Sequence, residues 1–252
     1  PVATQLAQKF QTPLALLSIA DDSARLSQKV YLDQLAAQHP HCSAAIQTAV
    51  QTGPVAKTIE QTAVSQNVNL IVMSTRGHSG MRRLLLGSVA GQLVQQATLP
   101  LLLLPPTMET AVPTQFHKIL ITLDGSKYAE RVLPYTLPIA QKFGSELLLL
   151  TVPQRNTKET LGLKIKQYLD SVATFCNNEG ILAKVCLTGR DPAKTAIQLS
   201  QAKNIDLIML AALERGNWQR MLLGSVADEI VRHTNCPVFL VPIREQRMPD
   251  KS

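Results

Sequence analysis

Short apolar runs alternate along this chain with longer segments in which apolar residues recur at helical spacing. Leu70-Ile71-Val72 is typical of a buried parallel strand, and Val89, Leu93 and Val94 lie on one face of a predicted helix. In the second half, the pattern predicts strands at 118–123, 146–152, 182–187, 206–211 and 237–241. It predicts helices at 127–143, 159–178 and 192–202, and a last helix that begins at Gly224-Ser225. Strands joined by helical crossovers imply a doubly wound parallel sheet of the α/β class.

The second half of the chain repeats the first. Ala7-Gln8-Lys9-Phe10 returns as Ala140-Gln141-Lys142-Phe143, and Gly87-Ser88-Val89-Ala90 returns as Gly224-Ser225-Val226-Ala227. A period of about 137 residues is far too long for a solenoid, so the repeat predicts two copies of one domain.

The domain boundaries follow from the repeat. We expect the first domain at 1–106 and the second at 116–246, joined by a short Pro- and Thr-rich linker at 107–115 that holds them close. The first copy has no equivalent of 117–133, which supplies the first strand of the second copy. We therefore expect at least about 17 further residues upstream of Pro1 in the natural protein, or a second chain that swaps this strand in.

Composition narrows the possible partners. The 252 residues are 45% hydrophobic and carry a net charge of +7, but no Lys/Arg run exceeds two residues. A solvated basic surface is therefore a better interpretation than a nucleic-acid site. The four cysteines have no metal-site spacing and predict reduced, buried thiols in a cytoplasmic protein. The longest apolar run, at 99–106, is far shorter than the roughly 20 residues of a membrane span.

One stretch, 73–89, is the best candidate for binding chemistry. It combines a strand end, a loop rich in Gly and Arg, and the start of a helix at Gly87-Ser88. Glycines let the backbone approach a ligand, and the amides and dipole of a helix N-terminus attract an anion. Arg76, His78, Arg82 and Arg83 add positive charge. A simpler interpretation stays open, because Gly-Ser is also an ordinary start of a helix.

The residues of this stretch resemble the universal stress protein family over nearly the whole chain, as two tandem domains. Nucleotide-binding members carry Gly, two residues, Gly, nine residues and Gly-Ser or Gly-Thr after the fourth strand. Gly77 and Gly87-Ser88 match this spacing, while Ser74 replaces the first glycine. The turn Leu123-Asp124-Gly125-Ser126 in the second copy is also typical of the family.

The resemblance implies a Rossmann-like sheet of five strands in the order 3-2-1-4-5, with ATP, alone or with Mg²⁺, across the carboxyl ends of strands 1 and 4. Ile19 and Met73 would line the adenine pocket by analogy, although core packing explains them equally well. Family members commonly dimerise through their last strands; here the segment from Leu99 to Leu104 and the segment from Pro237 to Val241 would form that contact internally, and a homodimer is also possible. The site residues implied for the first copy are Ile19, Met73, Ser74, Gly77, His78, Gly87, Ser88 and Val89.

The second copy is a weaker candidate. Glu214 stands where Gly77 stands in the first copy, and its carboxylate would repel a phosphate. Asp124, Gly224 and Ser225 remain as weaker candidates. Because Gly-Ser-Val-Ala survives in the copy with the decayed loop, part of its role is expected to be structural.

These patterns favour a nucleotide-responsive binding and signalling protein, with ATP in the first domain and a degenerate second domain. The alternatives are an interaction module that binds no nucleotide, or the regulatory tail of a larger protein such as a transporter. No catalytic base, metal spacing or Walker loop is visible, so a weak ATPase is the most that the sequence supports as an enzyme.

Overall fold

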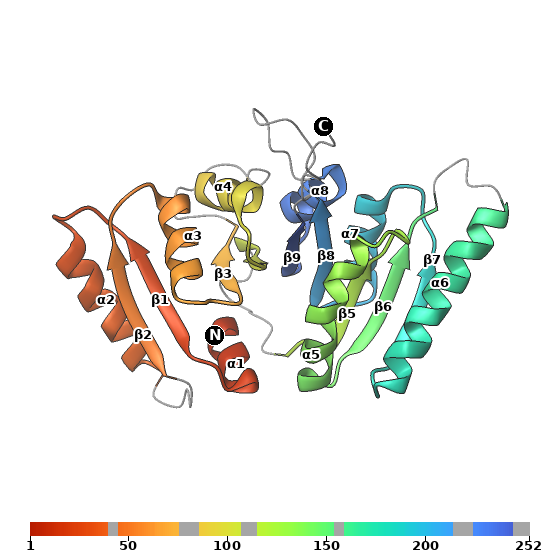
Figure 1. Ribbon diagram of the computed structural model, residues 1–252, viewed down its shortest axis with the longest axis horizontal. Coiled ribbons are helices and arrows are strands. Elements are labelled where there is room, and N and C mark those ends of the chain that lie inside the picture. The colour runs from red at the N-terminus through yellow and green to blue at the C-terminus, as the bar shows by residue number, and fades with distance from the viewer. Residues whose placement is uncertain (40–44, 76–85, 107–114, 154–158, 214–223, 244–252) are drawn as a thin grey trace, which may run out of the picture.

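The computed structural model describes residues 1–39, 45–75, 86–106, 115–153, 159–213 and 224–243 (Figure 1). The first repeat contains α1 (Val2–Phe10), β1 (Leu14–Ile19), α2 (Arg25–Ala37), β2 (Ile46–Gln51), α3 (Val55–Ser65), β3 (Ile71–Ser74), α4 (Ser88–Gln96) and β4 (Leu101–Leu104). The second repeat contains β5 (Lys118–Thr122), a 3₁₀ turn (Ala129–Val132), α5 (Leu133–Phe143), β6 (Glu146–Thr151), α6 (Glu159–Asn178), β7 (Ala183–Leu187), α7 (Pro192–Ala202), β8 (Leu207–Leu213), α8 (Ser225–His233) and β9 (Val238–Ile243).

The second repeat forms the complete doubly wound sheet that the sequence predicts. Its strands lie in the order β7-β6-β5-β8-β9, all parallel, which is 3-2-1-4-5 when they are numbered within the repeat. The strand order reverses beside β5, so the carboxyl ends of β5 and β8 frame the crevice where such sheets bind ligands.

The first repeat is divided between two sheets. β1 and β2 form a parallel two-stranded sheet, while β3 and β4 extend the sheet of the second repeat to seven strands, in the order β3-β4-β9-β8-β5-β6-β7. Among the described residues no strand lies between β1 and β3, the position that β5 fills between β6 and β8. The expectation of a further strand upstream of Pro1 stays a prediction.

The two repeats meet through an antiparallel pair of strands. Leu101, Leu102 and Leu103 of β4 lie opposite Leu240, Phe239 and Val238 of β9. The three leucines are completely buried, and each contributes roughly 1.5–3 kcal/mol relative to an exposed side chain. The interface is therefore part of the continuous hydrophobic core.

Two apolar layers cover the seven-stranded sheet. One layer takes its helical residues from α1, α5 and α6, including Leu6, Ile139 and Leu169. The other takes them from α3, α4, α7 and α8, including Leu93 and Ile230. Because α1 belongs to the first repeat and packs beside α5 of the second, helices as well as strands join the two repeats.

The environment of β3 differs from the sequence expectation. Its residues Ile71, Val72 and Met73 are only half-buried, although the run predicts a buried strand. The matching residues of β8, including Ile208 and Met209, are completely buried. The difference arises because β8 has a neighbouring strand on both edges, whereas β3 pairs only with β4 among the described strands.

Helix α5 also begins differently from the predicted helix over 127–143. Ser126 caps the segment as expected, since its Oγ accepts a hydrogen bond from the Ala129 amide at 3.1 Å. A 3₁₀ turn follows, and α-helical structure starts only at Leu133. Pro134 and Pro138 lack the amide hydrogens that would bond to the carbonyls of Glu130 and Pro134, which disfavours a regular helix over the first turns.

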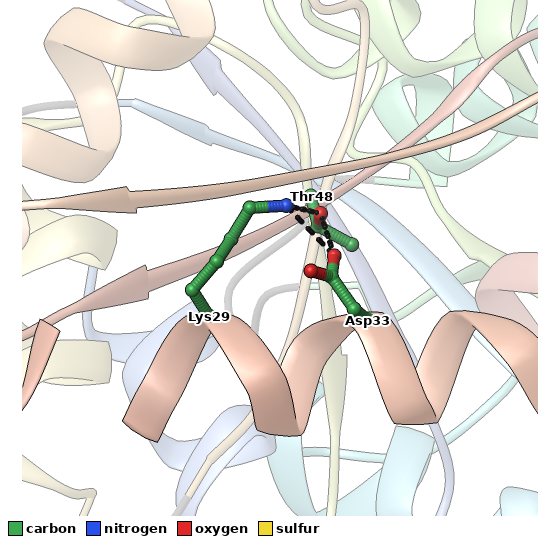
Figure 2. Close-up of polar contacts among 3 residues, drawn as sticks. All are labelled: Lys29, Asp33 and Thr48. Atoms are coloured by element: carbon green, nitrogen blue, oxygen red, sulfur yellow. Dashed lines mark hydrogen bonds and ion pairs between the residues drawn. The ribbon is translucent and has the colours of Figure 1, made fainter. Parts of the chain in front are cut away.

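A polar contact holds α2 against β2 (Figure 2). Lys29 and Asp33, one helical turn apart, form an ion pair of 2.7 Å, and the Thr48 hydroxyl of β2 donates to Asp33. Val185 occupies the matching position of β7 and packs against the apolar core. At this position the first repeat therefore has a polar contact where the second repeat has an apolar one.

Candidate functional site

The base of the candidate anion loop is closed by backbone hydrogen bonds. The Thr75 amide donates to the Leu104 carbonyl at 2.8 Å, which fixes the chain just beyond the end of β3. The Gly87 amide donates to the Thr75 carbonyl, also at 2.8 Å. The segment that leaves β3 therefore returns to the same point before α4 begins.

The first turn of α4 has amides that no helical hydrogen bond uses. The first helical bond runs from the Gly91 amide to the Gly87 carbonyl at 2.7 Å, so the amides before Gly91 lie ahead of the helical ladder. Ser88 is the first helical residue and is exposed, while Val89 is half-buried. Amides outside the helical ladder, an exposed hydroxyl and the positive end of the helix dipole together favour a negatively charged group.

The same geometry recurs at the start of α8. Gly224 has φ −52° and ψ 141°, close to the φ −58° and ψ 152° of Gly87, and neither helix start has a side-chain cap. Ser225 is exposed as Ser88 is. These dihedral angles suit any residue, so the two glycines serve close packing or close approach rather than an unusual backbone conformation. The recurrence supports a structural role for Gly-Ser-Val-Ala in both copies.

The predicted apolar residues come from two different sheets. Met73 is half-buried in β3 and packs against the layer that contains α3 and α4. Ser74 is exposed at the end of the same strand. Ile19 is half-buried at the carboxyl end of β1, in the two-stranded sheet. No described hydrogen bond joins the strand that carries Ile19 to the strand that carries Met73.

Several predicted residues lie outside the described part of the chain. Gly77 and His78 fall within 76–85, together with the three arginines of the loop. Glu214, which distinguishes the second copy, falls within 214–223. Thr75, by contrast, is one of the two residues that the family motif leaves unspecified, although its carbonyl closes the loop. Its only sequence signal is its position directly after a strand.

The acidic turn of the second repeat has a clear local role. The Asp124 carboxylate is exposed and its Oδ1 accepts the Ser126 amide at 2.9 Å, while Ser126 caps the turn that follows. Gly125 has φ +81°, a conformation that favours glycine. One carboxylate oxygen of Asp124 is therefore used to shape the turn.

Tyr168 of α6 packs beside this turn. A Cβ placed on Gly125 would meet its ring at 4.0 Å. The hydroxyl of Tyr168 is buried without a hydrogen-bond partner of good geometry among the described atoms. Burial raises the pKa of Tyr168, and the nearby carboxylates of Glu130 and Asp124 raise it further, so the phenol stays neutral. It adds no charge to the second site.

Two further features of the described residues concern metal ligands and thiols. They contain no group of three or more His, Cys, Asp or Glu side chains that could hold a metal ion. Cys176, Cys186 and Cys236 are free thiols. No described helix is both long enough and apolar enough to cross a membrane.

Comparison with known proteins places both repeats in one family. The model of the universal stress protein family matches residues 2–105 and 115–242. A universal stress protein of Mycolicibacterium smegmatis is 24% identical over 226 residues, which cover 85% of this chain and 74% of that protein.

Two solved structures have the same fold over most of the chain. A universal stress protein of Archaeoglobus fulgidus superposes with a TM-score of 0.71 at 23% identity, covering 91% of this chain and 85% of that one. A protein of unknown function from Pseudomonas aeruginosa gives a TM-score of 0.73 at 16% identity, covering 95% and 85%.

Proposed function

This chain belongs to the universal stress protein family, and from that membership we propose that it is a nucleotide-responsive binding protein of the cytoplasm. The first repeat binds ATP, alone or with Mg²⁺, with the phosphates at the N-terminus of α4. The second repeat keeps the fold but is degenerate as a nucleotide site. The proposed activity is binding and signalling, with ATP hydrolysis absent or weak.

The hydrogen bond between the Gly87 amide and the Thr75 carbonyl carries this proposal. It brings Thr75, at the carboxyl end of β3, next to Gly87, directly before the amides of α4 that no helical hydrogen bond uses. A loop anchored at both ends beside a helix N-terminus can present backbone donors to a phosphate with little loss of entropy on binding. Ser88 adds an exposed hydroxyl beside the same amides.

The asymmetry between the repeats is the second part of the proposal. Glu214 in place of Gly77 puts a carboxylate into the loop of the second copy. Two like charges about 4 Å apart repel by roughly 4 kcal/mol at an intermediate dielectric constant, which disfavours a bound phosphate. Asp124 does not offset this repulsion, because it is itself an exposed carboxylate, and one of its oxygens holds the turn.

We further propose that β4 and β9 take the place of the subunit interface of dimeric family members. Their antiparallel pairing links the strand after α4 to the strand after α8. Nucleotide binding at α4 could then be transmitted to the second repeat through this shared pair of strands. A homodimer of the whole chain is compatible with this arrangement.

A second candidate function is an interaction module that needs no nucleotide. It is favoured by the outward side of α2, where Leu26, Val30 and Tyr31 are 77%, 48% and 57% exposed. Contiguous exposed apolar patches mark contact surfaces, whereas single exposed apolar residues are normal, so these three side chains support this function as a group. The chain would then act through that surface, as a separate protein or as a regulatory part of a larger one.

Calorimetric titration with ATP distinguishes these functions. We expect one ATP per chain for the wild type and at least about a tenfold loss of affinity for Gly77→Glu, because the new carboxylate repels the phosphates. Glu214→Gly is the matched control at the equivalent position of the second repeat, and it should leave the first site unchanged. Equal affinities of wild type and Gly77→Glu would exclude the first-repeat site.

A further inference from the structure

β2 is the outer strand of the first repeat. It pairs only with β1 among the described strands, just as its counterpart β7 pairs only with β6 at the outer edge of the seven-stranded sheet. The second edge of β2 faces away from β1. With α2, this strand lies at the opposite end of the molecule from α6 and β7, away from β4 and β9 (Figure 1). An unpaired edge presents backbone donors and acceptors that another strand can satisfy.

The hydrogen-bond pattern identifies the groups at this edge. The Leu14 amide donates to the Ala45 carbonyl at 2.9 Å, which sets the parallel pairing of β1 with β2. Alternate residues of a strand in such a pair point toward the neighbouring strand, so the amides and carbonyls of Ile46, Thr48 and Val50 point away from β1. Among the described residues, no hydrogen bond uses these backbone groups. They are therefore the donors and acceptors of the open edge.

The edge of β2 lacks the devices that block the edge of β7. β2 reads Ile-Gln-Thr-Ala-Val-Gln, with no charge and no proline. β7 carries Lys184 at the position of Gln47, and this lysine forms a 2.6 Å ion pair with Glu146. The Ala183 amide, which points away from β6, donates to the Oδ1 of Asn177 at 3.0 Å. Charged residues and covered backbone groups protect a sheet edge from pairing, and only β7 has both.

The contacts of α2 show which of its sides lies beside this edge. Gln28 faces β1, where its Oε1 accepts a hydrogen bond from the Ser18 hydroxyl at 3.1 Å. Lys29 and Asp33 face β2, where both contact the Thr48 hydroxyl (Figure 2). The side of α2 that carries Lys29 and Asp33 therefore lies over β2, and the side beyond it lies farther from β1.

Two apolar side chains continue this side of α2. Because a helix has 3.6 residues per turn, Leu26 and Val30 follow next to Asp33 around the axis, on the side away from Gln28. They are 77% and 48% exposed. The shared sequence Tyr-Leu-Asp at 31–33 and 168–170 places Gln167 of α6 at the position of Val30. The first repeat thus has an apolar row beside an open edge, where the second has a more polar row beside a blocked one.

We propose that β2 and this side of α2 form the interface of a homodimer, in which β2 pairs antiparallel with β2 of a second copy about a twofold axis at Thr48. In this register Ile46 lies opposite Val50 of the second copy and Thr48 opposite Thr48, so every outward residue exchanges both backbone hydrogen bonds. Pairs of β-branched residues and of two threonines are favourable cross-strand neighbours.

The self-complementarity of the surface identifies a second copy as its occupant. Each outward position of β2 is β-branched, so the edge matches itself when it is reversed. Lys29 and Asp33 together give the row on α2 no net charge, so two such rows meet without repulsion. Leu26 and Val30 are then buried against the α2 helix of the second copy. This interface needs no nucleotide and lies away from the N-terminus of α4.

Sedimentation equilibrium of the full chain without nucleotide tests the interface. We expect a reversible dimer, and at least about a tenfold higher dissociation constant for Leu26→Gln, because a symmetric interface loses the leucine twice. Leu163→Gln is the matched control at the equivalent position of α6 and should leave the dimer unchanged. Gln47→Lys copies the residue of β7 and should weaken the dimer without changing ATP affinity. Circular dichroism checks that each variant folds. A chain that stays monomeric, or equal dissociation constants for wild type and Leu26→Gln, overturns the proposal.

Disulfide trapping tests the register. The proposed pairing places Gln47 opposite Ala49 of the second copy in a pair without hydrogen bonds, with Cα atoms about 4.5 Å apart, which a disulfide can bridge. A mixture of the Gln47→Cys and Ala49→Cys chains should therefore form a covalent dimer on mild oxidation. Either variant alone should form much less, and the wild type measures the background from its native cysteines. Equal cross-linking of the mixture and of the single variants contradicts the register and overturns the proposal.

Discussion

The ammonium group of Lys9 lies 5.4 Å from the centroid of the Phe143 ring, over its face. Lys9 belongs to α1 of the first repeat, and Phe143 ends α5 of the second. Both residues come from the same repeated tetrapeptide, Ala-Gln-Lys-Phe. Equivalent segments of the two copies thus meet each other, and the lysine of one copy contacts the phenylalanine of the other.

This contact predicts that substitutions of two equivalent lysines differ in their effect on stability. Lys9→Gln removes the cation above Phe143 and should lower the free energy of unfolding by about 0.5–1 kcal/mol, the usual size of an exposed cation–π contact. Lys142→Gln is the matched control in the second repeat and should lower the free energy of unfolding less. Urea denaturation of both variants measures the difference, and equal losses would show that the Phe143 contact contributes nothing.

The N-cap of α7 predicts how substitutions of Asp191 change the stability of the protein. The Asp191 carboxylate accepts the Lys194 amide at 3.1 Å. Asp191→Ala should destabilise the protein by about 1 kcal/mol, while Asp191→Asn should be nearly neutral because asparagine caps equally well. Asp191 also forms an exposed ion pair of 3.7 Å with Lys194. The asparagine variant removes this ion pair and keeps the cap, so it separates the two contributions to stability. If Asp191→Asn lost as much stability as Asp191→Ala, the stabilisation would come from the charge of Asp191 and not from the cap.

The contact between α2 and β2 predicts a pH-dependent effect. Hydrogen bonds from Lys29 and Thr48 lower the pKa of Asp33 below its ordinary 3.8. A carboxyl whose pKa is lower in the folded state stabilises the protein above its unfolded-state pKa, and this stabilisation is lost as the pH falls through the folded-state value. Asp33→Asn should therefore lower Tm at pH 7 and have no effect at about pH 2.

A double-mutant cycle checks the origin of this effect. Lys29→Met should reproduce the loss at pH 7, and the combined variant should lose little more than either single variant, because both remove one shared contact. Thermal unfolding at several pH values provides the measurement. A Tm difference for Asp33→Asn that stays constant from neutral to acidic pH contradicts the prediction.

The thiol of Cys236 is expected to be unreactive in the folded protein. Burial, and secondarily the Asp206 carboxylate, raise the pKa of Cys236 to about 12, so the thiolate is scarce at pH 8. Its Sγ also donates to the Ile205 carbonyl at 3.2 Å. Iodoacetamide at pH 8 should alkylate Cys236 more slowly than the half-buried Cys186, with the two rates equal in urea. Peptide mass mapping measures both rates, and rapid native labelling of Cys236 would exclude a closed core there.

The sequence predicts much of the second repeat correctly because its signals are local. The spacing of apolar residues predicts α6 and α7 with their observed bounds, and Asp191 before Pro192 predicts the N-cap. The candidate site is harder to predict from such local signals. Gly87 and Ser88 are recognisable from their motif, but Thr75 gains its role only through hydrogen bonds to Gly87 and to Leu104.

The sequence by itself determined that the chain contains two copies of one parallel α/β domain, since periodicity and repetition are properties of the chain. Only the tertiary structure decided that β4 and β9 pair antiparallel, and that β3 and β4 join the strands of the second copy in one seven-stranded sheet while β1 and β2 form a sheet of their own. It also decided that β3 is half-buried while the similar run in β8 is fully buried. The physical reason is that the burial of a strand depends on its neighbours in the sheet, and those neighbours come from distant parts of the chain.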